Sequence, residues 1–297
     1  QLSETASEQK SMRRTGPLPA ALLFSFVVTH SGLPGFPLMF LPSVYFLQDH
    51  PPRQRPPMRQ IFFALPYVCP REPARIADLI REHGTLRDVA AGEVLKRGGD
   101  ANRLFLLEEG ICAYFVAGAT TGHSTIMSLL LPGTTLCDMT SSVGRRCNVE
   151  TRAVQASKVW CTAPDFYERH VFTNPGLAVE KYHHAVGKQE ATLEGMIANF
   201  TLPPEQRVKI LLKAVLLHEH AGIGSDWMRI PYDLPAEVIG QTVNLTRQTV
   251  AQTIGDWRRA GLARRVGRHL EVLPTLFDDI YDWIEHRGGC LPDWHMG

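Results

Sequence analysis

The sequence predicts an α+β protein in which a small antiparallel β-barrel of jelly-roll type, a long helix and a compact helical domain with a β-hairpin follow one another. Three observations predict this order. Short β-like runs lie between residues 84 and 160, an apolar repeat of 3.5 residues follows over 179–200, and two short amphipathic helices lie within 234–273. With 297 residues and 44% hydrophobic content, the chain has enough material for two domains, each with its own core.

Residues 1–57 differ in composition from the rest of the chain. They are rich in proline, and residues 15–48 contain no Asp, Glu, Lys or Arg. The pair Arg13-Arg14 followed by an apolar run over 18–28 superficially matches a secretory signal, but the run is too short to span a bilayer. We expect an over-extended gene start, with the working start near Met58, or a disordered segment, and no association with membranes.

Residues 58–173 are expected to form the first domain. Residues 74–83 have the amphipathic period of a helix, and five β-like runs follow it, at 92–95, 104–107, 111–116, 124–131 and 151–160. Turn signals such as Glu109-Gly110 and Pro132-Gly133 separate the runs. This spacing is typical of a small antiparallel barrel or jelly roll.

The long helix, expected over residues 174–202, carries a coiled-coil seam. Seam positions step alternately by three and four residues: Val179, Tyr182, Val186, Gln189, Leu193, Met196 and Phe200. Such a repeat is typical of two helices packed along a common line, and Gln189 could fix their register by pairing with its symmetry mate. The alternative is that the helix packs only on its own barrel. Pro203-Pro204 cannot continue the helix and predict a hinge.

The last domain, residues 203–297, contains a helix-turn-helix pattern. After a helix over 205–219, the apolar positions of residues 238–243 and 250–257 mark two short helices with only residues 244–246 between them. Thr246 can cap the second helix with its hydroxyl. The runs 262–266 and 269–273, broken at Gly267-Arg268, predict a β-hairpin wing, and residues 276–286 are expected to form a final amphipathic helix.

The second short helix offers a polar face and lies in a basic region. Arg247, Gln248, Ala251 and Gln252 lie near its N-terminus, the end that approaches base edges in a major groove. Residues 246–269 contain six arginines and one aspartate, although the whole chain has a net charge of only +1. Such a patch suits the phosphates of double-stranded DNA. The alternative is a solvated arginine face on an interaction protein that does not bind DNA.

The segment from Ile239 to Leu273, IGQTVNLTRQTVAQTIGDWRRAGLARRVGRHLEVL, resembles the winged helix-turn-helix of the CRP/FNR family of bacterial transcription regulators. The resemblance extends, more weakly, over residues 75–275. It implies a homodimer with a cyclic-nucleotide-binding-like sensor, a dimerisation helix, RNA polymerase as a partner and a cytoplasmic location. It also implies a DNA-binding face that consists of Thr246, Arg247, Gln248, Ala251, Gln252, Arg264, Arg265 and Arg268. In this face the three arginines of the wing contact phosphates.

The same resemblance implies a small-molecule effector site at the turn Cys137-Asp138-Met139 and at Thr192. In cyclic-nucleotide-binding relatives this turn reads Gly-Glu-Leu, and an Arg-Ser pair binds the phosphate. Here the pair's positions hold Cys147 and Asn148. An effector other than cyclic AMP is therefore favoured, although Thr192 matches the dimer-helix threonine that meets the adenine base in cyclic-AMP receptors.

The turn is also similar to that of the carbon-monoxide-sensing haem member of the family, in which a Cys and a His of this turn ligate iron. Cys137 matches the cysteine, whereas Met139 stands at the histidine position. Three interpretations of Cys137 stay open: a haem ligand in a gas or redox sensor, a redox thiol with Cys147 as its partner, and a small buried apolar residue.

No catalytic or metal-binding constellation is readable, so we expect the protein not to be an enzyme. A barrel enzyme is the alternative class, but such barrels usually carry a His/Glu metal cluster, and His123 is the only histidine between His83 and His170. The groups His183-His184 and His218-Glu219-His220 place neighbours on different helix faces and predict surface histidines. Six scattered cysteines without a CxxC pair favour free thiols in a reducing compartment.

Overall fold

The computed structural model of the chain describes residues 64–97, 100, 103–117, 124–138, 149–219 and 226–280. The chain divides into two compact units, Gln1–Met58 and Arg59–Gly297, and every described residue belongs to the second. The expectations for residues 1–57 and for the end of the last helix therefore lie outside the described residues. Within the described part, no helix is both long enough and apolar enough to cross a lipid bilayer.

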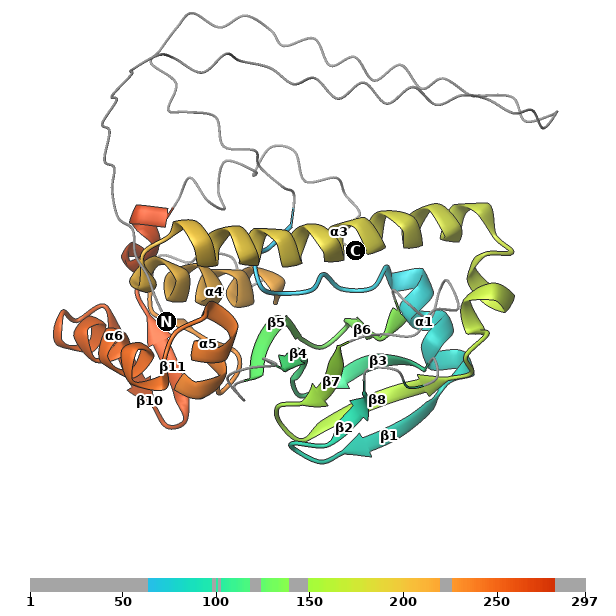
Figure 1. The fold of residues 1–297 in the computed structure, drawn as a ribbon, viewed down its shortest axis with the longest axis horizontal. Helices are drawn as coiled ribbons and strands as arrows, with labels where there is room; N and C mark the ends of the chain where they lie inside the picture. Colours follow the sequence, from blue (N-terminus) through green and yellow to red (C-terminus); the bar gives the residue numbers. More distant parts are fainter. Residues whose placement is uncertain are drawn as a thin grey trace, which may run out of the picture. The chain divides into compact units, whose positions relative to one another are not determined.

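Two four-stranded antiparallel sheets form the N-terminal half (Figure 1). Their strand orders are β1-β8-β3-β6 and β2-β7-β4-β5. Helix α1 (Ala74–His83) precedes them and confirms the helix predicted over residues 74–83. The strands are β1 (Thr85–Val89), β2 (Val94–Lys96), β3 (Leu104–Glu109), β4 (Cys112–Ala117), β5 (Ser124–Leu130), β6 (Thr135–Leu136), β7 (Glu150–Ala153) and β8 (Ser157–Thr162).

Among the described residues the two sheets are not closed into a barrel, so the barrel part of the expectation is wrong, whereas two four-stranded antiparallel sheets agree with its jelly-roll part. The chain crosses from one sheet to the other between β7 and β8. There the backbone N–H groups of Val154 and Gln155 both donate to the carbonyl of Ile111, at 2.7 and 3.2 Å, instead of pairing with a neighbouring strand. The run predicted as one strand over residues 151–160 is therefore two strands that lie in different sheets.

Strand β3 is buried on both faces and separates two apolar clusters. Because successive side chains of a strand point to opposite faces, Phe105 and Leu107 join the core between the sheets, while Leu104 and Leu106 face α1 and the π-helical turn η1 (Tyr167–Val171). The first cluster contains Cys69, Val89, Leu95, Phe105, Leu107, Cys112, Leu130, Leu136, Cys137, Ala153 and Val159.

The long helix α3 (Pro175–Thr201) confirms the helix expected over residues 174–202. Asn174 caps it, because its side-chain oxygen accepts the backbone N–H groups of Gly176 and Leu177, and Pro175 occupies the first turn. The helix ends at Thr201, and Leu202, its C-cap, is extended. Pro203 then precedes a second helix, α4 (Pro204–His218), so the proline pair separates two helices as expected.

The C-terminal domain contains the predicted helix-turn-helix and wing. Helix α4 packs against α5 (Ala236–Val243) and α6 (Arg247–Arg259), and the wing strands β10 (Ala263–Val266) and β11 (His269–Val272) are joined by β9 (Met228–Arg229) in a three-stranded sheet. The expected final α-helix is a 3-10 helix, η2 (Pro274–Ile280), as far as the structure describes it. This tighter winding buries Leu276, Phe277 and Ile280.

Two glycines with a positive φ test how tightly the turn between β3 and β4 is packed. Gly110 lies in that turn, and Gly92 lies between β1 and β2. Gly110 has a φ of +91°, and a Cβ at this position would collide with the Ser157 side chain and lie 2.5 Å from the Ala156 carbonyl oxygen. Gly92 has a φ of +81°, but a Cβ there would have nothing within 4 Å. Substitution of Gly92 by Ala should lower the free energy of unfolding by about 1–2 kcal/mol through backbone strain alone.

Substitution of Gly110 by Ala should cost at least about 1 kcal/mol more than the Gly92 substitution, because the collision adds to the strain. Urea unfolding of both variants followed by circular dichroism measures the difference. Equal losses of unfolding free energy in the two variants would show that Ala156 and Ser157, at the crossing between β7 and β8, leave room for a side chain at position 110.

Candidate functional site

The two helices of the helix-turn-helix are held at a close approach by a left-handed residue after α5 and a glycine within it. Asn244, directly after α5, adopts the left-handed conformation with a φ of 54°, and its N–H donates to the Gly240 carbonyl. A Cβ on Gly240 would lie 2.6 Å from the Leu245 carbonyl oxygen, so only glycine permits this turn. Thr246 then caps α6, as predicted, by accepting the Thr249 N–H at 3.1 Å.

The structure brings the predicted base-reading residues together on one exposed face of α6. Arg247, Gln248, Ala251 and Gln252 are all exposed, whereas Val250 and Trp257 are buried on the opposite face. The Trp257 indole N–H donates to Glu205 Oε1 at 2.8 Å and so ties α6 to α4. This contact was not anticipated from the sequence. The exposed face is therefore carried by a helix whose other face is fixed in the core.

The three wing arginines differ in what they already contact. Arg264 Nε pairs with Glu271 Oε2 at 2.7 Å, and its guanidinium lies 4.2 Å from the centre of the Trp227 ring. Arg265 approaches Asp233 at 4.0 Å, the limit of an ion pair. Arg268 is exposed at the tip of the hairpin and has no ion pair with any residue that the structure describes. Among the described residues, Arg265 and Arg268 thus make weaker or fewer ion pairs than Arg264.

The predicted effector turn lies in the interior of the two-sheet, N-terminal half. Cys137 has a φ of +65°; its N–H donates to the Tyr114 hydroxyl at 3.1 Å, and its Sγ lies 3.3 Å from Thr151 Oγ1. Only 3% of Cys137 is exposed. Met139, Cys147 and Asn148 lie outside the described residues. In the described part, Cys137 therefore has the surroundings of a buried cysteine in a packed core.

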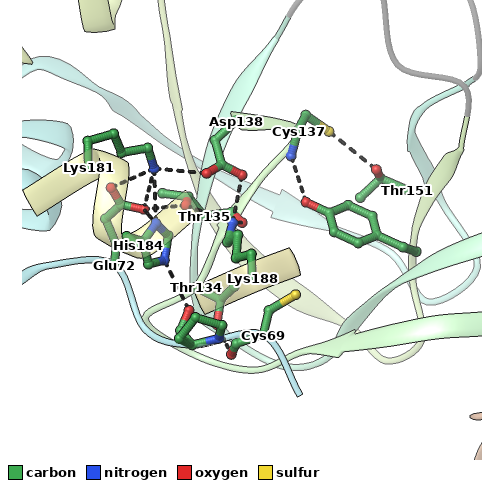
Figure 2. Close-up of polar contacts among 12 residues, drawn as sticks. Cys69, Glu72, Thr134, Thr135, Cys137, Asp138, Thr151, Lys181, His184 and Lys188 are labelled. Carbon is green, nitrogen blue, oxygen red and sulfur yellow. Dashed lines mark hydrogen bonds and ion pairs between the residues drawn. The ribbon is translucent and has the colours of Figure 1, made fainter. Parts of the chain in front are cut away.

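Asp138 is bound by two lysines of α3. Its Oδ1 accepts from Lys188 Nζ at 2.6 Å and its Oδ2 from Lys181 Nζ at 2.8 Å (Figure 2). Lys181 Nζ also donates to both carboxylate oxygens of Glu72, at 2.8 Å each, and to His184 Nδ1 at 3.2 Å. All five side chains are buried. We call this set, Glu72, Asp138, Lys181, His184 and Lys188, the buried charge cluster.

The charges of this cluster balance. Burial acts to raise the pKa values of Glu72 and Asp138, but the interactions with His184, Lys181 and Lys188 of α3 outweigh it, so both carboxyl pKa values lie below their usual range. Burial also acts to lower the pKa of Lys188, and the Asp138 carboxylate outweighs it and raises that pKa. Burial lowers the pKa of His184 to about 3, so the imidazole is neutral at neutral pH. Two carboxylates therefore face two ammonium groups.

The cluster has the residue types of a metal site but already contains a cation. One ligand atom each from Glu72, Asp138 and His184 lie within 4.8 Å of one another. Lys181 Nζ contacts all three residues, at 2.8 to 3.2 Å, and so occupies the position that a cation would take. The arrangement fits an internal ammonium better than a metal ion.

The expectation of surface histidines is wrong for His184 and His218. His184 is 1% exposed and His218 is 5% exposed, and the Nε2 atom of His218 lies 3.4 Å from the Pro132 carbonyl oxygen. Each lies on the face of its helix that packs against the rest of the domain. His183 is exposed, as predicted, and His220 lies outside the described residues.

A row of polar side chains crosses the inner face of the second sheet. Strand register places Lys96 opposite Thr151, Thr151 opposite Tyr114, and Tyr114 opposite Ser128. Opposite residues share a face. Ser128 Oγ lies 3.1 Å from Thr192 Oγ1, so the row reaches the predicted effector residue Thr192 on α3. At its other end Lys96 Nζ is buried without a hydrogen-bond partner in the part of the chain that the structure describes.

The outer face of α3 carries the predicted seam. Val179, Tyr182, Leu193, Met196 and Phe200 are exposed, with Phe200 at 82%, although most are large and apolar. The inner face carries the polar residues of the buried charge cluster. The helix thus packs on its own domain with a polar face and leaves an apolar face uncovered in the single chain.

No protein-family profile matches this chain, and no curated protein has a matching sequence. Solved structures do match. FixK2 from Bradyrhizobium japonicum has a TM-score of 0.57 and 15% identity, over 64% of this chain and 92% of that one. TTHB099, a CRP-family transcriptional regulator of Thermus thermophilus, has a TM-score of 0.53 and 16% identity, over 67% and 98%. TTHA1359, a CRP/FNR-family regulator of the same organism, has a TM-score of 0.51 and 15% identity, over 68% and 98%. The chain therefore has the fold of CRP/FNR regulators, as its sequence resemblance implies.

The buried charge cluster makes Asp138 a sensitive position for stability. Substitution of Asp138 by Asn should lower the free energy of unfolding at pH 7 by about 3–5 kcal/mol, because two buried ammonium groups then share one carboxylate. The pKa of Asp138 is lowered by folding, so its contribution is present above its unfolded pKa of about 4 and is lost as the pH falls below it. The difference between wild type and variant should therefore shrink in acid.

The control is the substitution of Asp165 by Asn, because Asp165 is 44% exposed and pairs with Arg169 on the surface. It should cost less than about 1 kcal/mol. Urea unfolding between pH 3 and pH 7 measures both variants. A cost at Asp138 as small as that at Asp165 would contradict the described role of the cluster.

Proposed function

We propose that this protein is a transcription regulator that binds a palindromic DNA site as a homodimer and responds to a small-molecule effector. The observation that carries the proposal is the exposed face of α6, on which Arg247, Gln248, Ala251 and Gln252 surround the capped N-terminus of a helix fixed by Trp257. The CRP/FNR fold supports it, because regulators are among the proteins with the same fold. RNA polymerase is then the protein partner of the promoter-bound regulator.

The residue types of this face suggest what it reads. Arg suits the O6 and N7 atoms of guanine, and Gln suits the N6 and N7 atoms of adenine. We infer half-sites with one guanine read by Arg247 and adenines read by Gln248 and Gln252. In a symmetric dimer the half-site centres lie roughly 34 Å apart, one turn of the double helix.

The wing supplies phosphate contacts in this proposal. Arg265 and Arg268 are exposed and weakly engaged, so their guanidinium groups are available to phosphates. Arg264 is held between Glu271 and Trp227, and we assign it first to the shape of the wing and second to DNA. Thr246 adds a hydroxyl at the N-terminus of α6, where helix dipole and free N–H groups favour a phosphate.

The partner of the apolar face of α3 is a second copy of the chain. Its seam positions repeat every 3.5 residues, and the exposed side chains at five of them cost free energy in water. Packing two such helices along the seam buries Tyr182, Leu193 and Phe200 of both copies. It also places two recognition helices on one molecule, as a palindrome requires.

The effector site of the proposal is the polar row that ends at Lys96. An unpartnered buried ammonium is unfavourable, so a ligand with an anionic or acceptor group would be bound there. Lys96 lies on β2, an edge strand of its sheet. Haem fits the described residues poorly, because Cys137 belongs to the packed cluster between the sheets and its Sγ faces the Thr151 hydroxyl.

The row also suggests how an effector acts on DNA binding. Thr151 lies opposite Lys96 and contacts Cys137, and Cys137 precedes Asp138, which α3 holds through Lys181 and Lys188. A ligand that moves Thr151 therefore shifts the turn that positions α3. The change reaches α4 through Pro203 and Pro204, and the dimer changes between two geometries that differ in DNA affinity.

Substitution of Arg247 by Ala should weaken binding to the specific site by about 1–3 kcal/mol and leave binding to random DNA nearly unchanged, because it removes a base contact. Substitution of Arg268 by Ala is the matched comparison. It should weaken both kinds of DNA alike and reduce the salt slope of binding by about one, because it removes a phosphate contact.

Gel-shift titrations at several salt concentrations, on a site selected from random sequence, measure both variants. An Arg247 variant that loses random and specific DNA equally would contradict base reading. A wild-type protein that selects no sequence at all, with or without cell metabolites, would overturn the proposed function.

Substitution of Leu193 by Glu should convert the dimer to a monomer at micromolar concentration, because it places two carboxylates at a buried position of the seam. Substitution of His183 by Glu is the control, since His183 is exposed on α3 beside the seam and not on it. Sedimentation velocity measures both. A Leu193 variant that stays dimeric would place the interface elsewhere.

A further inference from the structure

The C-terminal domain contains a hollow to which the proposed function assigns no ligand, although Ala251, Arg265 and Arg268 of the proposed DNA-binding face line it. Its volume is about 270 Å³, and it lies between the segment that leads into α5, helix α6 and the wing. Its floor is apolar and includes Ile230, Leu234, Ile239, Ile254 and Leu270. Ile230 and Ile239 are part of the domain core, so the hollow opens directly onto that core.

Two small residues of α6 leave this space open. Ala251 and Gly255, one turn apart, line the hollow with Ile254. A Cβ on Gly255 would meet only Arg259 Nη1, at 3.7 Å, which is ordinary contact. A larger side chain at position 255 would therefore be accepted by the fold and would fill part of the hollow.

Three arginines line the same hollow above its apolar floor. Arg258, Arg265 and Arg268 are exposed, and the acidic residue lining the hollow with them, Asp233, reaches Arg265 only at 4.0 Å. Arg258 and Arg268 have no ion pair with any described residue. A cationic mouth over an apolar floor matches a ligand with an apolar body and one negative group.

We propose that this hollow binds a small amphipathic carboxylate, with its apolar part against Ile254 and Leu270 and its carboxylate between Arg258 and Arg268. The site is distinct from the sensor interior. Because Arg265 and Arg268 are also the wing groups assigned to DNA phosphates, the bound carboxylate competes with DNA. That competition rests on the proposed function, whereas the ligand site itself does not.

The first experiment measures ligand binding to the full chain without DNA. The probe is octanoate below its micelle concentration, followed by saturation-transfer NMR, and octan-1-ol is the uncharged comparison. Octanoate should bind about tenfold more tightly than octan-1-ol, because a charge-assisted hydrogen bond to arginine is lost in the alcohol. Substitution of Arg258 by Gln should remove most of that preference. Equal binding of acid and alcohol to the wild type would overturn the proposal.

A matched pair at position 255 separates filling of the hollow from effects on the helix. Both Gly255→Ala and Gly255→Leu replace a glycine in the middle of α6 with a better helix former. Only the leucine is large enough to fill the space. Octanoate binding should persist in the Ala variant and fall at least about tenfold in the Leu variant, while both keep the wild-type circular dichroism. Unchanged binding in a folded Leu variant would overturn the site.

The second experiment tests the competition. Octanoate at saturation should raise the Kd for DNA at least about tenfold in the wild type and in the Ala variant, and should leave the Leu variant unaffected. Octanoate that binds the wild type without changing its Kd for DNA would overturn the competition and leave the ligand site standing. Absence of DNA binding by every variant would overturn the proposed function, and the octanoate titration would still test the site.

Discussion

The buried charge cluster is the interaction on which the rest of the structure depends. Lys181, His184 and Lys188 are spaced by three and four residues and therefore lie on one face of α3. They enter the N-terminal half and meet Glu72 and Asp138, so each ammonium is matched by a carboxylate. Buried charges are expensive unless they are paired, and removal of one partner leaves the other uncompensated. Helix α3 therefore has one favourable position against the sheets.

This constraint also decides which face of α3 points outward. A helix that covers a domain usually buries its apolar side and exposes its polar side. Here the inward face carries lysines and a histidine, and Tyr182, Leu193 and Phe200 are left outside. The cluster fixes the rotation of the helix about its axis. In the proposed dimer a second copy covers the exposed seam, and the inner contact keeps that seam aligned for it.

Local patterns in the sequence were enough to predict the parts of the fold that local contacts determine. Helix α1, the turn at residues 244–246, the Thr246 cap and the hairpin at Gly267 each depend on residues within one or two turns, and the structure confirms them. The barrel part of the expectation was wrong because the chain changes sheets at Val154, where its N–H donates to the distant carbonyl of Ile111. Sequence periodicity does not contain that pairing.

The buried charge cluster was predicted less completely, because it also depends on residues that are distant in the sequence. The Lys181 partners Asp138 and Glu72 lie 43 and 109 residues away, so no spacing rule links them. One signal was available: when one face of a helix is an apolar seam, the opposite face must pack on its own domain. Lys181, His184 and Lys188 occupy that face, so the seam was enough to predict their burial, although His184 was expected at the surface. The DNA-reading face stays a prediction, because exposure permits contact with DNA without demonstrating it.

The connection between the N-terminal half and the helix-turn-helix domain also extends beyond the proline pair. The chain over residues 67–72 runs along α3 (Figure 1), where the Tyr67 N–H donates to the Ala191 carbonyl at 3.3 Å and its hydroxyl donates to Asn199 at 3.0 Å. A Cβ on Gly195 would lie 2.8 Å from the Tyr67 ring, so this glycine allows the close approach.

At the far end of this segment, neighbouring residues contact different parts of the molecule. Glu72 pairs with Lys181 in the cluster, and Arg71 pairs at 2.9 Å with Glu219, the residue that ends α4. Glu219 in turn accepts the Tyr232 hydroxyl at 2.5 Å, in the segment that leads into α5. Because Arg71 and Glu72 are consecutive, a shift of Glu72 also displaces the partner of Glu219. The expected hinge at Pro203 and Pro204 is therefore one of two connections. The second joins the Asp138 turn to the base of the helix-turn-helix through side-chain contacts and the peptide bond between Arg71 and Glu72.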